Sequence, residues 1–179
     1  MNVEHLLDVF VSIDPNLAGV WDACSNFLEH LQWHKPRLVT LGPKIEGLSD
    51  DHPSKPQCLY ELSWWFNLVG NRVKFKRLLI HSLEIWRQRG KDLKVAETLW
   101  CISRANRLLG LHGEGIQRAK EALDIYRRLD VITGQAQSWK ELAHLLFKDK
   151  QLDAAEEAAS KAIDLLDQDG VVLLILPLC

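Results

Sequence analysis

The sequence predicts an all-α fold, a right-handed superhelix (solenoid) built from antiparallel helical hairpins. Two observations carry this prediction. Three segments repeat with a 40-residue period, and their closing apolar residues are Leu83, Leu123 and Ile163. Within a segment, residues at the i and i+3 spacing of one helix face are apolar, as Leu99 and Ile102 are. Repeats of this length are typical of quasi-one-dimensional stacks of supersecondary units.

The 40-residue register aligns apolar and small residues in both halves of every segment. In the first half the aligned sets are Leu59, Leu99 and Trp139; Leu62, Ile102 and Leu142; and Ser63, Ser103 and Ala143. In the second half they are Phe75, Gly115 and Ala155; Leu79, Ala119 and Ala159; Ser82, Ala122 and Ala162; and Ile85, Ile125 and Leu165. Small side chains let two helix backbones approach closely, so each segment is interpreted as a helical hairpin. Helix breakers separate the halves at Gly70-Asn71, at 110–113 and at 149–151.

The hairpins are expected at about 54–92, 93–131 and 132–170, with Pro56 in the first turn of the first helix. Residues 1–53 are expected to form an N-terminal helical segment with a degenerate first repeat. It contains an amphipathic helix over 17–31 and a second helix from Pro36, which Gly42-Pro43 should kink or break.

The last nine residues, 171–179, form an uncharged apolar run where a further hairpin should begin. A solenoid normally closes with a polar capping element. The first hypothesis is a truncated next repeat, or an end with foreign sequence. The alternative is a tail that folds back over the last hairpin as its cap.

The order of a bulky residue, Leu and a small residue in the first helix, then small residues in the second, resembles the tetratricopeptide repeat (TPR). The TPR unit is about 34 residues long, so the resemblance implies that each second helix, or the loop after it, is longer by roughly six residues. The stretch "WHKPRLVTLGPKIEGLSDDHPSKPQCLYELS" further resembles the long-repeat region of fungal STAND/NACHT-type NTPase-associated proteins. No nucleotide-binding P-loop motif accompanies it. HEAT-type repeats, of similar period, are the structural alternative.

Composition excludes several classes of protein. With 179 residues, 47% hydrophobic and 26% charged, the chain has the composition of a globular protein and not of a disordered one. Its net charge of −2 argues against a globally basic nucleic-acid binder. Four scattered cysteines do not make a disulfide scaffold, and the N-terminus lacks the pattern of a signal peptide. The apolar C-terminal run is too short to span a membrane. A cytoplasmic location is therefore expected.

Charge is distributed unevenly along the chain. Residues 71–128 carry 14 Lys and Arg against 6 Asp and Glu, whereas the segments on either side are each acidic. In a TPR superhelix the first helix of each hairpin lines a concave groove. Polar and aromatic residues on the helix face opposite the aligned apolar and small residues should point into this groove. These candidate partner-binding residues are Trp64, Asn67, Trp100, Arg104, Arg107, Lys140 and His144. Aromatic side chains beside Arg and Lys suit an extended acidic peptide. The arrangement resembles the carboxylate clamp of chaperone-binding TPR domains without matching its Lys-Asn pair.

The sequence contains no motif that predicts a catalytic or metal-binding site. His30 and His34 are four residues apart, but the sequence lacks the Glu of a zinc-protease motif, so they are interpreted as a surface pair. Cys58 and Cys101 are interpreted as packed small hydrophobic residues. We expect no catalytic residues, no metal and no cofactor.

The sequence therefore favours a non-catalytic protein-interaction module that binds a protein or peptide partner, acidic in character, in a concave groove. Two alternatives remain open. The chain could be a structural or self-associating fragment of a larger STAND-like protein, without a groove of its own, that associates through its exposed repeat ends. Binding of RNA or phosphate through the basic middle would instead predict an affinity that falls steeply with salt.

Overall fold

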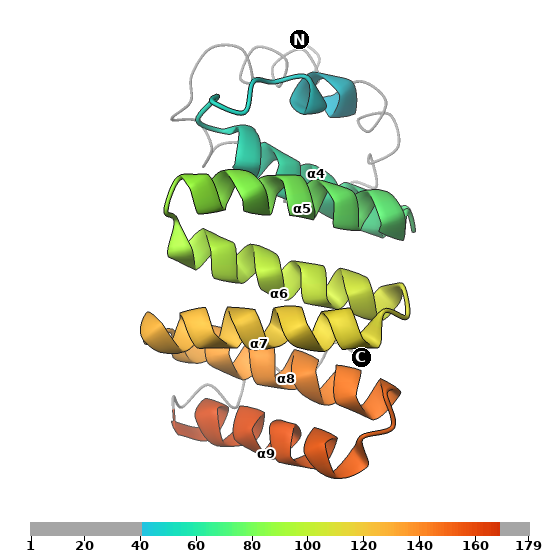
Figure 1. The fold of residues 1–179 in the computed structure, drawn as a ribbon, viewed down its shortest axis with the longest axis vertical. Coiled ribbons are helices and arrows are strands. Elements are labelled where there is room, and N and C mark those ends of the chain that lie inside the picture. The colour runs from blue at the N-terminus through green and yellow to red at the C-terminus, as the bar shows by residue number, and fades with distance from the viewer. Residues whose placement is uncertain (1–40, 169–179) are drawn as a thin grey trace. The chain divides into compact units, whose positions relative to one another are not determined.

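The computed structural model describes residues 41–168, and these residues are all-α (Figure 1). Residues 41–46 are helical, and the helices that follow are α4 (Lys55–Leu68), α5 (Arg72–Gln88), α6 (Asp92–Leu108), α7 (His112–Arg128), α8 (Ile132–Lys148) and α9 (Leu152–Gln168). The chain divides into two compact units, Met1–Ile85 and Trp86–Cys179, with the boundary inside α5. The predicted helix over 17–31, the His30–His34 pair and the apolar run 171–179 lie outside the described residues.

The helices follow the 40-residue period of the sequence. The second helices of the three hairpins begin at Arg72, His112 and Leu152, and the first helices end at Leu68, Leu108 and Lys148. The expectation that only the second helix or its loop is lengthened was wrong. Each of the helices α5 to α9 has 17 residues, about three more than a 34-residue unit with equally short turns can hold. In the second and third hairpins both helices therefore share the extra length, whereas α4 of the first hairpin has 14 residues.

Every helix from α4 to α8 ends in the same kind of turn. A residue with positive φ recurs at every twentieth position, namely Gly70, Gly90, Gly110, Asp130 and Lys150. The N–H of the next residue then donates to the carbonyl five residues back, as Leu111 does to Asn106 over 2.9 Å and Val131 does to Tyr126 over 2.9 Å. This is the Schellman motif, in which the left-handed residue lets the chain reverse and satisfies the last helical carbonyls. The turn chemistry is what produces the hairpins.

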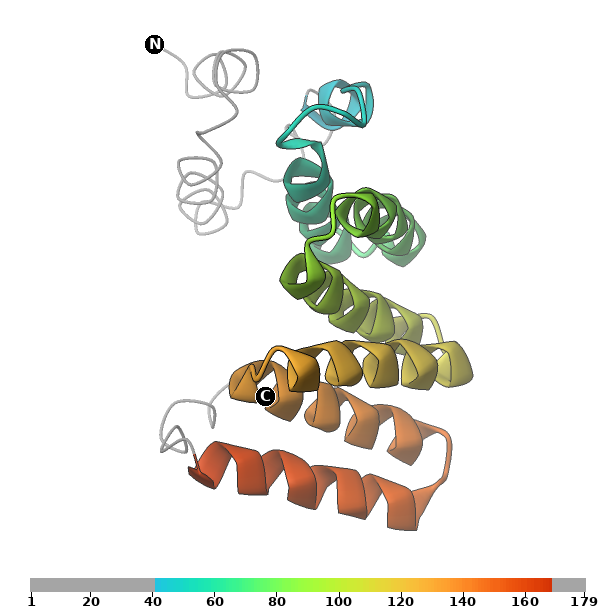
Figure 2. The same cartoon turned by 60° about the vertical axis from the view of Figure 1, so that its left-hand side comes forward.

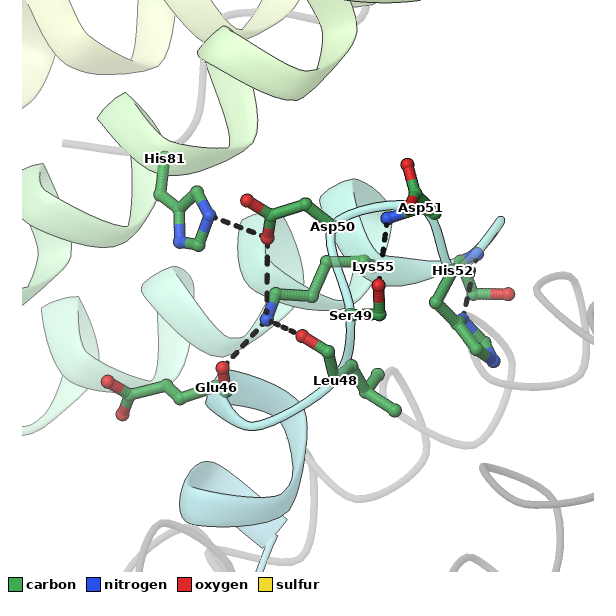
Figure 3. Close-up of polar contacts among 9 residues, drawn as sticks. Glu46, Leu48, Ser49, Asp50, Asp51, His52, Lys55 and His81 are labelled. Atoms are coloured by element: carbon green, nitrogen blue, oxygen red, sulfur yellow. Dashed lines mark hydrogen bonds and ion pairs between the residues drawn. The ribbon is translucent and has the colours of Figure 1, made fainter.

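In the first unit, the buried Lys55 fastens the segment that precedes α4 (Figure 3). Its Nζ donates to the carbonyl oxygens of Glu46 at 2.7 Å and Leu48 at 2.5 Å, and lies 3.8 Å from Asp50 Oδ1. The same Asp50 oxygen is 2.9 Å from Nε2 of His81 on α5. An ammonium group at the carbonyl end of the helix over 41–46 complements the partial negative charge of that end. These contacts tie the segment to both α4 and α5.

Gly42 and Pro43 lie within the helix over 41–46, and the part of the predicted helix that precedes them, residues 36–40, lies outside the described residues. Pro56 lies in the first turn of α4, as predicted. Within the unit, Ser82 on α5 donates from Oγ to the carbonyl of Pro56 over 2.7 Å, and both helices bury their aligned residues.

In the second unit, α6, α7, α8 and α9 pack in chain order, and α8 lies between α7 and α9 in both ribbon views (Figure 1 and Figure 2). Small residues set the spacing of α6 and α7, because Ser103 Oγ donates to the carbonyl of Gly115 over 2.9 Å and both residues are buried. Around α8 the core residues are Ala119, Leu123, Leu142, Leu145, Leu146, Ala155 and Ala158. The small-residue columns thus mark close helix contacts, as predicted.

Burial follows the columns closely in the first two hairpins and less closely in the last. Leu83 and Leu123 are 3% and 2% exposed, whereas Ile163 at the same position of α9 is 57% exposed. Cys58 and Cys101 are buried, in agreement with their interpretation as packing residues. No helix within residues 41–168 is both long enough and apolar enough to cross a membrane.

Candidate functional site

A groove of about 540 Å³ lies between the two first helices of the second unit, α6 and α8, and reaches the last turn of α9. Its lining residues are Trp100, Arg104, Arg107, Thr133, Ala136, Gln137, Lys140, Glu141, His144 and Leu166. Five of the seven residues predicted from the sequence are among them. The helical spacing explains the convergence, because residues three, four and seven apart lie on one helix face.

The groove is cationic. Arg104, Arg107 and Lys140 contribute positive charge, and among the described residues Glu141 is the one acidic member of the lining. Arg107 donates from Nε to Glu141 Oε1 over 2.7 Å, and the Glu141 side chain is only 5% exposed. Glu141 therefore balances the charge of Arg107, and the lining contains two further cationic residues, Arg104 and Lys140. Lys140 is exposed and makes no ion pair with another described residue.

Trp100 forms one wall of the groove. Its indole N–H donates to the carbonyl of Gln137 over 3.2 Å, so the side chain extends from α6 to α8. The indole is half-buried. Because its polar N–H already has a partner within the protein, the part of the ring that faces the groove offers apolar contact area.

His144 is the titratable residue of the groove with a perturbed pKa. Partial burial lowers the pKa of His144 below its ordinary value, and the positive charges of Arg107 and Lys140 lower it further, while Glu141 acts in the opposite direction. Each of these causes has a plain physical basis, since desolvation and nearby cations both disfavour the imidazolium. At neutral pH His144 is accordingly an uncharged hydrogen-bonding group.

The remaining two predicted residues, Trp64 and Asn67, belong to α4 in the other unit. Trp64 is half-buried and packs against Phe75 of α5, with ring centroids 5.4 Å apart, and against Tyr60 at 6.4 Å. This packing gives Trp64 a role within its own hairpin. Its neighbour Trp65 is 2% exposed and belongs to the core.

Sequence reasoning missed Glu141, the carboxylate of the groove, along with the neutral lining residues Thr133 and Gln137. A signal for the neutral residues was present, because they precede Lys140 by seven and three residues and so lie on its helix face. Glu141 also lies on this face, three residues before His144, but its burial and its ion pair gave no signal in the sequence. It occupies the position that Cys101 has in the preceding hairpin, and its burial depends on Arg107 of another helix.

The described residues contain no cluster of three or more His, Cys, Asp or Glu side chains that could hold a metal ion. The groove combines guanidinium and ammonium groups, a neutral imidazole and an aromatic wall. Such a set can bind carboxylates and apolar side chains.

No family model and no curated protein matches the chain. Solved structures do match its fold. The nearly identical TPR-like repeats of kinesin-light-chain type from Podospora anserina align with a TM-score of 0.61 at 16% identity, over 87% of this chain and 74% of theirs. A single-substitution variant of those repeats gives a TM-score of 0.62 at the same identity and coverage. BtubC (BKLC) from P. vanneervenii aligns with a TM-score of 0.61 at 18% identity, over 85% of this chain and 60% of its own length.

At these identities the likeness is one of fold. It agrees with the sequential antiparallel hairpins, the 40-residue period and the small-residue helix contacts found in the described residues. By its fold, the chain is a TPR-like helical-repeat protein.

Proposed function

We propose that the chain is a non-catalytic interaction module that binds an acidic peptide segment of a protein partner in the groove between α6 and α8. The observation that carries this proposal is the convergence of Arg104, Arg107 and Lys140 on one hollow, whose described lining contains a single carboxylate. TPR-like repeats generally serve as interaction scaffolds, and extended binding surfaces are what stacked repeats provide.

We assign a different role in peptide binding to each type of residue in the groove. Arg104 and Lys140 supply the charge that attracts carboxylates, and a guanidinium can bind a carboxylate through two hydrogen bonds. Trp100 supplies an apolar surface for a neighbouring side chain, as aromatic residues do at the centres of interfaces. The Arg107–Glu141 hydrogen bond links α6 to α8 beside the groove, and a groove that is already formed lowers the cost of binding a partner.

The proposal can be tested with an array of immobilised dodecapeptides that differ only in the number of Asp and Glu residues. Binding of the wild-type chain should rise with the number of acidic residues and weaken as salt is added, because exposed charges are screened. The Arg104→Ala/Lys140→Ala variant should lose this dependence. The matched control is Lys120→Ala/Arg128→Ala, which removes two exposed positive charges from α7 outside the groove.

Equal losses in the two double variants would mean that overall charge, and not the groove, attracts the peptides. Binding that does not depend on the number of acidic residues would contradict the proposal directly. Circular dichroism of each variant establishes that the helices remain folded.

A further inference from the structure

A second hollow, here named the apolar furrow, lies between α8 and α9 and has a volume of about 470 Å³. Ala143 and Phe147 line it from α8, and Leu152, Ala159 and Ile163 line it from α9. Lys140, His144 and Leu166 line both this furrow and the cationic groove, so the two hollows adjoin. Phe147, Leu152 and Ile163 are each more than half exposed.

The exposed apolar side chains of the furrow have no exposed apolar counterparts at the same positions of the preceding hairpin. Phe147 occupies the position that Arg107 has one repeat earlier, and Leu152 occupies the position of His112. Ile163 belongs to a column whose other members are almost fully buried. A contiguous patch of large apolar side chains on a protein surface usually marks a contact site. The furrow therefore has the character of a surface that another apolar segment covers.

We propose that the apolar furrow is the docking site of residues 171–178 of the same chain, which lie outside the described residues. Their sequence, Val-Val-Leu-Leu-Ile-Leu-Pro-Leu, carries no charge and follows α9 after two residues. An apolar segment gains free energy in proportion to the apolar area that it buries, and the furrow offers such an area.

The regular spacing of the turns between helices supports a reversal of the chain after α9. Positive φ recurs at every twentieth position, most recently at Asp130 and Lys150, and the next position in the series is Gly170. Glycine adopts this conformation without steric cost. A Schellman turn at Gly170 would reverse the chain, as the corresponding turns do between the preceding helices.

The segment is long enough for the furrow. From Leu166 back to Leu152 the axis of α9 covers roughly 21 Å, at 1.5 Å per residue. Eight extended residues span up to about 26 Å. Covalent attachment adds an effective concentration in the millimolar range, so the segment competes well against separate partners.

A second copy of the chain is the other occupant that the test must distinguish. A second copy would approach the furrow with the charged side chains of its own surface, including Lys140 and Glu156 of the same face. Residues 171–178 carry no charge and are attached to α9, which favours them as the occupant.

A double-variant cycle on the full chain tests the proposal. The furrow variant is Ile163→Ser, and the tail variant is Leu173→Ser/Leu174→Ser/Ile175→Ser, which keeps the chain length. The readout is hydrogen–deuterium exchange of the α9 amides, because local opening reports the stability of this helix. Val73→Ser, which changes an exposed apolar residue of the other unit, is the matched control.

Each of the furrow and tail variants should speed exchange of the α9 amides by about five- to tenfold, the size expected from losing part of an apolar side-chain contact. The combined variant should show no further increase, because each change removes the same contact. The control should exchange at the wild-type rate in α9.

Additive effects in the combined variant, or a tail variant with wild-type exchange, would overturn the proposal. Sedimentation velocity gives a separate check. If the wild-type chain dimerises as its concentration rises and the Ile163→Ser variant stays monomeric, the furrow binds a second copy. That result would also overturn the proposal. Neither result depends on binding of acidic peptides to the cationic groove.

Discussion

Arg107 on α6 donates from Nε to Glu141 Oε1 on α8 over 2.7 Å, and the bond joins two successive first helices at the floor of the cationic groove. The Glu141 side chain is almost fully buried, and a quarter of the Arg107 side chain is exposed. Because water still reaches Arg107, the pair is weaker than a fully desolvated ion pair. It nevertheless joins α6 to α8 directly and lowers the net positive charge of the groove lining by one.

Replacing Glu141 with Gln should separate these two effects. The amide oxygen of Glu141→Gln can still accept the hydrogen bond, so we expect a loss of about 1 kcal/mol in the free energy of unfolding from the missing charge. Affinity for acidic peptides should rise several-fold, because the net positive charge of the groove increases by one. Urea unfolding and fluorescence anisotropy with a labelled acidic peptide measure the two quantities. Glu84→Gln, an exposed change of equal charge in the other unit, should leave both nearly unchanged.

Two glycines of the second unit should respond in opposite directions to replacement by alanine. A Cβ on Gly134 would lie 2.4–2.6 Å from ring atoms of the buried Tyr126, whereas a Cβ on Gly113 would have nothing within 4 Å. Both residues are helical. Gly113→Ala should stabilise the chain by about 0.5–1 kcal/mol through helix propensity. Gly134→Ala should destabilise it by about 1–3 kcal/mol, because a rigid ring must move. Thermal unfolding of the pair checks the prediction, and a stabilised Gly134→Ala would show that α7 and α8 separate at no cost.

Much of this fold could be predicted from the sequence because its signals are local and repeated. The 40-residue register predicted which residues of the first two hairpins are buried, and Gly70 and Gly110 predicted where the chain turns. The equal lengthening of both helices could not be read from the period alone. It depends on turns at Asp130 and Lys150, where residues other than glycine adopt positive φ.

The candidate site was predictable to the extent that it lies on one helix face. Arg104 and Arg107 on α6, and Lys140 and His144 on α8, follow helical spacing, and the structure brings them together. The burial and the ion pair of Glu141 were not predictable, because both depend on Arg107, which belongs to a helix of the preceding hairpin. The close approach of Gly134 on α8 to Tyr126 on α7 was also not predicted, because it depends on how the two helices pack.

The turn at Lys150 offers a test of the Schellman series. Lys150 has a φ of 63°, where a side chain with Cβ is strained and glycine is not. Lys150→Gly should therefore stabilise the chain by about 0.5–1 kcal/mol, and Gly110→Ala, at a φ of 76°, should destabilise it by at least a similar amount. Urea unfolding measures both. The interpretation fails if Lys150→Gly lowers the urea midpoint, since Lys150 lies outside the core and its loss removes no packing.

Asn106 is a buried polar residue in a column that is otherwise apolar. It is 1% exposed, and neither its amide nitrogen nor its side-chain oxygen has a hydrogen-bond partner among the described residues. The residues one repeat before and after it are Phe66 and Leu146. Burial of an unpaired amide costs about 1–3 kcal/mol, so Asn106→Leu should raise the free energy of unfolding by an amount in that range. A lower stability of Asn106→Leu, measured by urea unfolding, would mean that the amide has a partner that its surroundings do not show.

The lowered pKa of His144 makes stability depend on pH in a defined direction. Burial, Arg107 and Lys140 all disfavour the imidazolium in the folded chain, whereas in the unfolded chain His titrates near 6.5. The unfolded state therefore takes up the proton first, and the folded chain loses stability as the pH falls below about 6.5 towards the folded pKa. The urea midpoint should fall between pH 7.5 and pH 5.5, and this fall should be smaller for His144→Gln than for the wild type. Lys140→Gln should show an intermediate loss, because it removes one of the three causes and leaves burial and Arg107 in place. An identical loss in all three proteins would show that His144 does not carry this dependence.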